Sequence, residues 1–456
     1  MARDDVRLIR SPISVTGMVL TTISAVLFLV VFLADLFGLH TNPYIGIVFF
    51  LILPGLFLVG LALIPLGAWI ERRRRAAGKA PSAVYWPRID LNDPAQRTAA
   101  VLVFALTMAN VVIVSLAAYR GVQYMDSVQF CGQTCHAPMG PEFVAHEGGP
   151  HAHVKCVECH VGPGASSFTR AKLSGTRRVL AVTFRTYPRP IVPSADQLVS
   201  ARDTCEQCHW PERFHGDKIR RLSEYADDEK NTESVTTLRV HVGGGNGRQG
   251  TATGIHWHMN IANEIDYIAT DRERQVIPYV RMKDREGVVR EYVAAGVTAE
   301  QLSKGERRRM DCMDCHNRPS HVMAATPERA VNETMARGDI PRTLPFIHRE
   351  AVKALKATYP SQEAGAAEIS RALRDFYRSQ PQILAARAPE IERAVLAIQD
   401  AYRRNVFPDM NVKFGTYANN IGHIDSAGCF RCHDDDHKSK DGRKIGQDCE
   451  ICHAIE

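Results

Sequence analysis

The twelve cysteines of this chain all fall in pairs, and a histidine directly follows the second cysteine of every pair. Two residues separate the cysteines in five of the six pairs, and three residues separate them in the first pair. This spacing allows two thiols to form thioethers with the vinyl groups of one porphyrin while the neighbouring imidazole binds the iron. The sequence therefore predicts six covalently bound haem c groups, attached through Cys131, Cys135, Cys156, Cys159, Cys205, Cys208, Cys312, Cys315, Cys429, Cys432, Cys449 and Cys452.

Two other uses of paired cysteines fit this pattern less well. Zinc ribbons do not need a histidine after every second cysteine, and disulfide frameworks have no reason to keep the two-residue spacing. We therefore expect haem at every motif. Because the first motif has the irregular spacing, the sequence leaves its axial ligation open.

The motif histidines are the predicted proximal ligands of the irons: His136, His160, His209, His316, His433 and His453. Distal ligands are expected among histidines that lie close to a motif or in a turn that could reach one: His151, His215, His258, His321, His423 and His437. Two histidine ligands saturate an iron, which suits electron relay. Met139, three residues after His136, either binds the first iron through its thioether or packs on the porphyrin.

The remaining histidines are not expected to bind iron. His256 competes with His258, because alternate residues of a strand face opposite ways and only one can point at a given iron. His40 is predicted to lie in a solvated loop between two membrane spans. Exposed positions are predicted for the others, which are His146, His153, His241 and His348.

The elements that position these sites begin with an apolar N-terminal region. Residues 14–38, 43–69 and 98–119 contain no lysine or arginine, and each stretch is long enough to cross a hydrocarbon core of about 30 Å as a helix. Arginines precede the first stretch and cluster between the second and third, whereas residues 39–41 carry no basic residue. The positive-inside rule therefore places the N-terminus in the cytoplasm and the chain after residue 119 in the periplasm, where bacteria attach haem c.

The fold class predicted is mainly α, with a membrane anchor over residues 1–119 and a multihaem domain that has little regular structure. Residues 120–325 hold four motifs and a small antiparallel β insert at 238–293, with strands expected at 275–281 and 288–293. Residues 326–410 lack cysteine and show helical periodicity, which predicts a haem-free helical insert. Residues 411–456 hold the last two motifs. The net charge of +6 does not indicate a nucleic-acid partner, because four consecutive arginines are a topology signal and haem propionates offset much of the rest.

Residues 98–321 resemble the NapC/NirT family of membrane-anchored, quinol-oxidising multihaem cytochromes c. The shared features are an anchor helix, Phe130-Cys131 with a nearby methionine, Pro150-His151 ahead of the second motif, a downstream lysine, and His321 five residues after His316. The longer layout, with extra N-terminal spans and a C-terminal haem pair, looks like the inner-membrane cytochromes of that family in metal-respiring bacteria.

The resemblance implies a quinol site beside the haem nearest the membrane, lined by a lysine and a carboxylate. Lys172 matches the lysine by its position after the second motif. Val179 stands where the smaller relatives have aspartate, and Asp126 or Glu142, which flank the first motif, could replace that carboxylate. A lysine can stabilise the developing quinol anion while a carboxylate accepts the proton.

The function predicted is that of a quinol dehydrogenase of the bacterial inner membrane. It would draw on the lipid-dissolved quinol pool and pass electrons to periplasmic acceptor proteins, either cytochromes or reductases. Two alternatives stay open: a haem subunit of a larger respiratory complex or oligomer that is fed by a protein partner, and a terminal reductase with an open coordination site on one iron.

Overall fold

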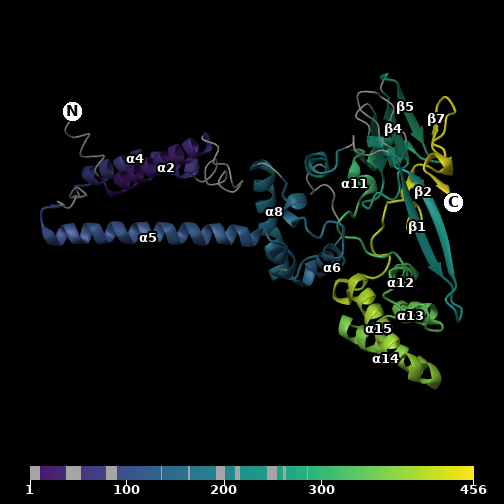
Figure 1. Cartoon of the computed structure of the whole chain (residues 1–456). Helices are drawn as coiled ribbons and strands as arrows, with labels where there is room; N and C mark the ends of the chain where they lie inside the picture. Colours follow the sequence, from purple (N-terminus) through teal and green to yellow (C-terminus); the bar gives the residue numbers. More distant parts are fainter. Residues whose placement is uncertain are drawn as a thin grey trace. The chain divides into compact units, whose positions relative to one another are not determined.

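The computed structural model describes residues 11–36, 53–78, 90–134, 136–162, 165–191, 201–210, 216–243, 254–259, 263–284 and 286–456. The chain divides into two compact units. The first consists of Met1–Met125 with Val161–Arg177, and the second of Asp126–His160 with Arg178–Glu456. Helices and small antiparallel sheets make up the regular structure, and Figure 1 colours them along the chain.

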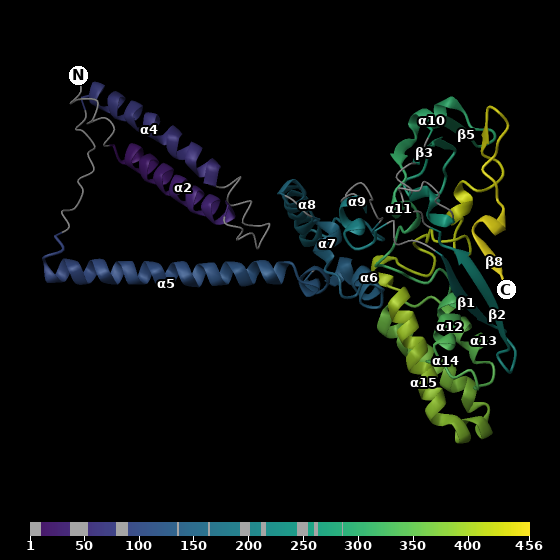
Figure 2. The ribbon, with the colours of Figure 1, turned by 45° about the horizontal axis from the view of Figure 1, so that its top comes forward.

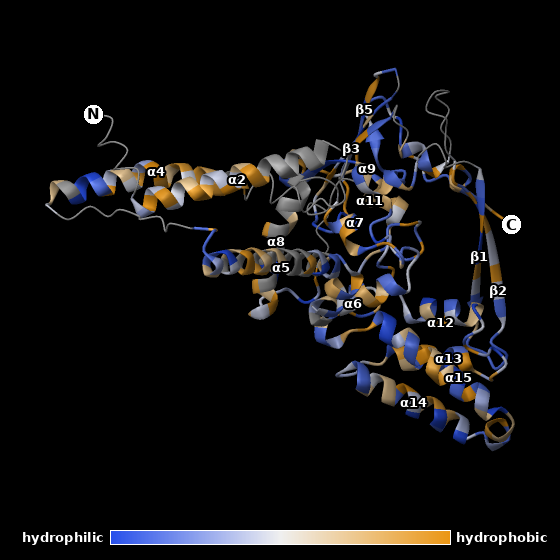
Figure 3. Ribbon diagram, turned by 60° about the vertical axis from the view of Figure 1, so that its left-hand side comes forward, coloured by the Kyte–Doolittle hydropathy of each residue, from blue (hydrophilic) through white to orange (hydrophobic). Residues whose placement is uncertain are grey.

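Long helices dominate the first unit: α2 (Pro12–Leu36), α4 (Leu53–Ala76) and α5 (Pro94–Met125). Helices α2 and α4 lie side by side, because Gly17 and Gly60 are too small to hold their backbones apart. The Ser14 hydroxyl also donates a hydrogen bond of 2.9 Å to the Ile64 carbonyl. Apolar residues cover much of both helices (Figure 3).

Membrane-crossing potential is clear for one of these helices. Among the described residues, Gly55–Arg74 is long and apolar enough to cross a membrane, which suggests membrane association. The apolar stretches Pro12–Leu27 and Pro94–Leu106 are shorter. Of the three predicted spans, only the second overlaps a segment that passes this test among the described residues. Residues 37–38 and 43–52 of the predicted spans, and His40, lie outside the described part of the chain.

Two antiparallel sheets lie in the second unit. One has the order β6-β3-β4-β5-β7 and contains β3 (Glu264–Ala269), β4 (Tyr279–Lys283), β5 (Val289–Val293), β6 (Glu306–Arg309) and β7 (Lys438–Ser439). The other has the order β1-β2-β8 and contains β1 (Asp217–Tyr225), β2 (Glu233–His241) and β8 (His453–Ile455). Alternate residues of β3 are buried, as expected of a strand with one face on a core.

The β structure is thus more extensive than the predicted insert at 238–293. The predicted hairpin is formed by β4 and β5. These strands pair in antiparallel fashion, with Lys283 opposite Val289 and Tyr279 opposite Val293. The sheets also contain strands that precede this hairpin and strands that follow it in the sequence. Two of these strands, β7 and β8, come from the last twenty residues of the chain. These strands tie the C-terminal motifs to the β region.

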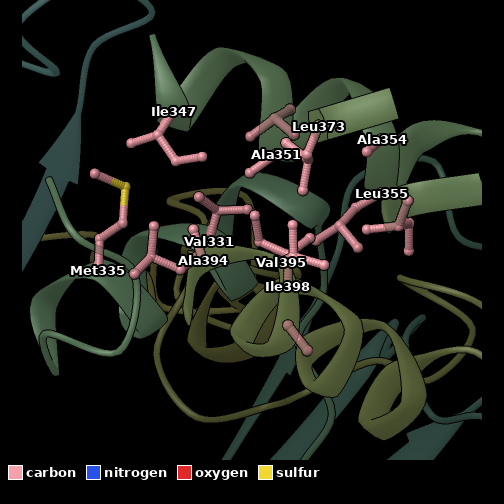
Figure 4. Packing of buried hydrophobic residues seen from close by; sticks show 14 of the residues in the cluster. Val331, Met335, Ile347, Ala351, Ala354, Leu355, Leu373, Ala394, Val395 and Ile398 are labelled. Atoms are coloured by element: carbon pink, nitrogen blue, oxygen red, sulfur yellow. The ribbon is translucent and has the colours of Figure 1, made fainter. Parts of the chain in front are cut away.

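The predicted helical insert contains four helices: α12 (Pro327–Ala336), α13 (Ile347–Lys356), α14 (Gln362–Arg378) and α15 (Pro381–Asn405). Thr326 and Ser361 cap α12 and α14, since each side chain accepts a hydrogen bond from a backbone N–H of the first turn. Ile347, Leu373 and Ile398 meet in one apolar core between the helices (Figure 4). Tyr225 of β1 belongs to the same core.

Shorter elements carry or connect the motifs. They are η2 (Phe130–Thr134), α6 (His136–Glu147), α7 (Cys156–His160), α8 (Ala165–Thr183), α9 (Ala201–Thr204), η4 (Cys205–Gln207), η6 (Ile255–Met259), α10 (Ala299–Lys304), α11 (Cys312–Cys315), η7 (Pro408–Met410), η8 (Gly428–Arg431) and η9 (Cys449–Ile451).

Candidate haem-binding sites

Each regular motif forms a single helical turn, found in α7, η4, α11, η8 and η9. In α11 the His316 N–H donates to the Cys312 carbonyl at 2.8 Å, and the His209 N–H donates to Cys205 over the same distance. Residues three and four apart lie on one face of such a turn. The two thiols and the imidazole of a motif therefore face the same side, as one porphyrin requires.

The irregular first motif begins in a different kind of turn. Cys131 lies in the π-helical turn η2, whose wider hydrogen-bonding pattern fits the extra residue before Cys135. Gly132 is buried there against the Phe143 ring, where a side chain would collide. Cys135 and the His136 side chain lie outside the described residues.

All eleven cysteines in the described part of the chain are free thiols, so they are available for thioether bonds. Thiols of successive motifs lie close together. A hydrogen bond with Cys131 lowers the pKa of Cys156 to about 6, which joins the first motif to the second. Burial raises the pKa of Cys159, and the Cys205 and Cys208 thiols of the third motif raise it further.

The same proximity continues along the chain. Burial raises the pKa of Cys312 most, and the nearby Cys205 thiol raises it further. The third motif therefore lies near the fourth. Burial raises the pKa of Cys432 to about 12, and Cys315 of the fourth motif adds to the shift. Cys452 of the sixth motif is affected in the same way by Cys429 of the fifth. Each motif therefore has a thiol near a thiol of the next motif in the sequence.

Pairs of imidazole rings lie at separations that one iron could bridge. An imidazole nitrogen binds a metal ion at about 2.0 Å and lies about 1.1 Å from its ring centre, so two rings on opposite faces of one iron have centres about 6.2 Å apart. Among the described residues, five motif histidines have such a partner, with ring centres 5.8 to 6.3 Å apart. The pairs are His151 with His209, His160 with His321, His256 with His316, His258 with His433, and His423 with His453.

The hydrogen bonds of two partner rings fix the tautomer that a metal-binding histidine needs. Nδ1 of His151 donates to the Pro319 carbonyl at 3.1 Å, and Nδ1 of His321 donates to the Glu142 carbonyl at 3.0 Å. A carbonyl oxygen only accepts, so Nδ1 carries the proton and Nε2 keeps its lone pair, as in most metal-binding histidines. Partial burial lowers the pKa of His321 and His258, which favours the neutral form that binds metal. The residues present therefore fit haem c.

The contacts of two histidines differ from those expected. His437 is buried, and its Nδ1 bonds to the Asp434 carboxylate and its Nε2 to the Ile277 carbonyl at 2.7 Å. These contacts do not favour His437 as an iron ligand. His256 and His258 do not exclude each other, because η6 is a turn and not a strand, and they face different motif histidines.

Other predicted positions also need correction. His146 and His348 are buried and not exposed: Nε2 of His146 bonds to the Val154 carbonyl at 2.9 Å, and Nδ1 of His348 bonds to Asp227 at 2.8 Å. His153 is exposed and His241 is partly exposed, with its ring paired to Asp217. His215 lies outside the described residues.

The candidate quinol-site residues are described to different extents. Lys172 lies in α8, but its side chain is outside the described part of the structure. Asp126 directly follows α5. The Glu142 carboxylate pairs with Arg318 at 2.9 Å and lies 3.2 Å from Nδ1 of His321, so its contacts give it a positioning role at the second motif. Met139 is partly buried in α6, three residues beyond His136.

Sequence reasoning missed a buried arginine that joins two motifs. Arg431, between the cysteines of the fifth motif, donates to the Asp314 carbonyl between the cysteines of the fourth motif at 2.6 Å. It also donates to the Arg274 carbonyl at 2.9 Å. Asp314 is buried as well and accepts a hydrogen bond from the Tyr267 hydroxyl. No sequence pattern marks such a contact, because its acceptors are backbone carbonyls distant in the chain.

Comparison with known proteins agrees with haem c attachment. No family model and no solved structure matches the chain. The cytochrome c-type protein ImcH of Geobacter sulfurreducens is 41% identical over 448 residues, which are 98% of this chain and 88% of that protein. Similarity at this level over nearly the whole length shows that the chain belongs to the family of the cytochrome c-type protein ImcH.

Proposed function

We propose that this protein is a membrane-anchored hexahaem cytochrome c of the NapC/NirT type, which oxidises quinol in the bacterial inner membrane and passes the electrons to a periplasmic acceptor protein. Its N-terminus would lie in the cytoplasm and its haem-binding unit in the periplasm. Haem bound at the motifs would supply one-electron oxidation and reduction.

The observation that carries the relay part of this proposal is the set of motifs whose histidines face second histidines. Five described motif histidines have a facing partner, which favours closed, six-coordinate irons over open catalytic ones. Thiols of each motif lie near those of the next, which supports an electron path from the first motif to the sixth. A terminal reductase would instead need an iron without a distal ligand.

The quinol part of the proposal rests on the sequence resemblance and on the apolar segment Gly55–Arg74. Lys172 would hold the quinol oxygen and stabilise the negative charge that develops when the proton leaves. We assign the Glu142 carboxylate, which pairs with Arg318, a positioning role, and we propose Asp126, directly after α5, as the proton acceptor.

Stopped-flow reduction of the purified haem-loaded protein by a menaquinol analogue tests this function. Rapid reduction supports quinol oxidation, and reduction only by an added protein donor would favour the complex-subunit alternative. Lys172→Leu should slow reduction by quinol on the order of a hundredfold, the loss typical of one preorganised charged donor. Reduction by dithionite is the control and should not change. An unchanged quinol rate would remove Lys172 from the site.

A further inference from the structure

We propose that the single turn η6 supplies the distal ligands of two neighbouring haems, His256 to the iron of the fourth motif and His258 to the iron of the fifth. The inference rests on the haem-binding part of the proposed function and is independent of quinol oxidation. If η6 binds both irons, this one turn sets the positions of the two haems relative to each other.

The geometry at both ends of the turn fits an iron. The ring centres of His256 and His316 are 6.3 Å apart, and those of His258 and His433 are 5.8 Å apart. These separations bracket the value of about 6.2 Å expected for two imidazoles on one iron. Because residues 256 and 258 lie in a short 3-10 turn, their rings can point to two different motifs.

The hydrogen bonds of the turn prepare both rings for metal binding. Nδ1 of His256 donates to the Val242 carbonyl at 3.1 Å, and Nδ1 of His258 donates to the Ile255 carbonyl at 2.9 Å. Since a carbonyl cannot donate, Nε2 of each ring is left without a proton. This fixes the same tautomer in both rings, with the lone pair on the nitrogen that an iron would bind.

The turn is anchored in the core of the five-stranded sheet. Trp257, between the two histidines, packs against the buried cluster that contains Ile265 and Tyr267, and Cys432 of the fifth motif packs against the same cluster. The Asn263 side chain donates to the Trp257 carbonyl at 3.0 Å. The fourth and fifth motifs are themselves joined by the contact from Arg431 to Asp314. Both sides of each proposed haem site are therefore joined by contacts within the second compact unit.

The two sites differ in the angle between their imidazole planes, which gives them distinct spectra. The rings of His256 and His316 are nearly parallel, at 6°, whereas those of His258 and His433 are nearly perpendicular, at 83°. In low-spin ferric haem, parallel imidazoles give a rhombic electron paramagnetic resonance spectrum. Perpendicular imidazoles give a strongly anisotropic spectrum with one very large g value.

Electron paramagnetic resonance of the oxidised full-length protein tests the assignment. His256→Ala should convert one haem per protein to high spin at the expense of the rhombic signals. His258→Ala should convert a different single haem at the expense of the strongly anisotropic signal, to which the His151 and His209 pair also contributes. Added imidazole should restore low spin in both variants, because the cavity left by the ring admits it. His241→Ala is the matched control, since that ring is paired with Asp217 and should leave the spectrum unchanged.

Intact mass decides whether each variant is fully loaded, which separates a failure of this inference from a failure of haem binding. A loaded His256→Ala or His258→Ala protein without high-spin iron overturns the proposal, as does loss of the same signal in both variants. If an alanine variant loses haem, the corresponding methionine variant, His256→Met or His258→Met, tests the ligand assignment instead. Methionine ligation should keep that haem low-spin and raise its midpoint potential, and an unchanged potential would overturn the assignment.

Discussion

The helical insert and the motif-bearing segments of the second unit differ in what fills their interiors. In α12–α15, Val331, Ile347 and Ile398 are fully buried among other side chains. Apolar residues beside the motifs are exposed instead. The exposed fraction is 46% for Trp210, next to His209, and 58% for Ile451, within the sixth motif. The insert therefore has a conventional core. We expect the porphyrins to supply the apolar interior of the motif segments, so the order of these segments should depend on haem attachment.

The largest effect should come from removing one haem. Cys312→Ala combined with Cys315→Ala prevents attachment at the fourth motif and should raise hydrogen exchange there and at the fifth motif, which Arg431 joins to it. The helices of the insert should stay protected, because their core contains no motif residue. Regional hydrogen exchange measures this, and intact mass confirms that one haem is missing. Equal loss of protection in the insert would contradict the distinction between the two regions.

Shortening a core side chain of the insert should destabilise the insert and leave the haem sites unchanged. Leu373 is buried to 1% exposure between the helices, so Leu373→Ala should lower the free energy of unfolding of the insert by about 2–5 kcal/mol. The haem absorption and paramagnetic spectra should be those of the unmodified protein. Leu396→Ala is the matched control, since Leu396 lies on α15 with 65% exposure and should cost little. A change in haem spin state caused by Leu373→Ala would show that the two regions are not independent.

A smaller effect, on the midpoint potential of one haem, is expected from changing Glu142 near the second motif. Glu142→Gln removes the charge beside Nδ1 of His321, which should raise the midpoint potential of one haem on the order of tens of millivolts. Spectroelectrochemical titration measures the shift, with Glu158→Gln as the control because Glu158 is exposed in the same motif. The rate of reduction by quinol should not change. A strong loss of quinol reduction would return Glu142 to the quinol site.

The sequence was most informative where the chemistry is local. A motif of five or six residues defines both thiols and one imidazole, and each regular motif folds as its own helical turn. The helical periodicity of residues 326–410 likewise predicted a region that contains four helices. In both cases the residues that determine the structure are near neighbours in the chain.

Predictions failed where distant residues decide. His437 follows a motif closely, but the Ile277 carbonyl occupies its second nitrogen. His348 is buried and bonds to Asp227, which is far away in the sequence. Two histidines separated by one residue read equally well as a strand or a 3-10 turn, and only the fold around η6 shows that His256 and His258 face different motifs. The strands β7 and β8 pair with residues more than a hundred positions away and have no local signature.

The intact mass of the purified protein under denaturing conditions, combined with a pyridine haemochrome assay and thiol labelling, tests haem attachment most directly. The twelve cysteines form six motifs, so we expect a mass excess of six haems with no thiol left to label. A mass excess of five haems with two reactive thiols in the first motif would show that its irregular turn does not attach haem. Fewer haems, or labelled thiols in a regular motif, would contradict the central claim.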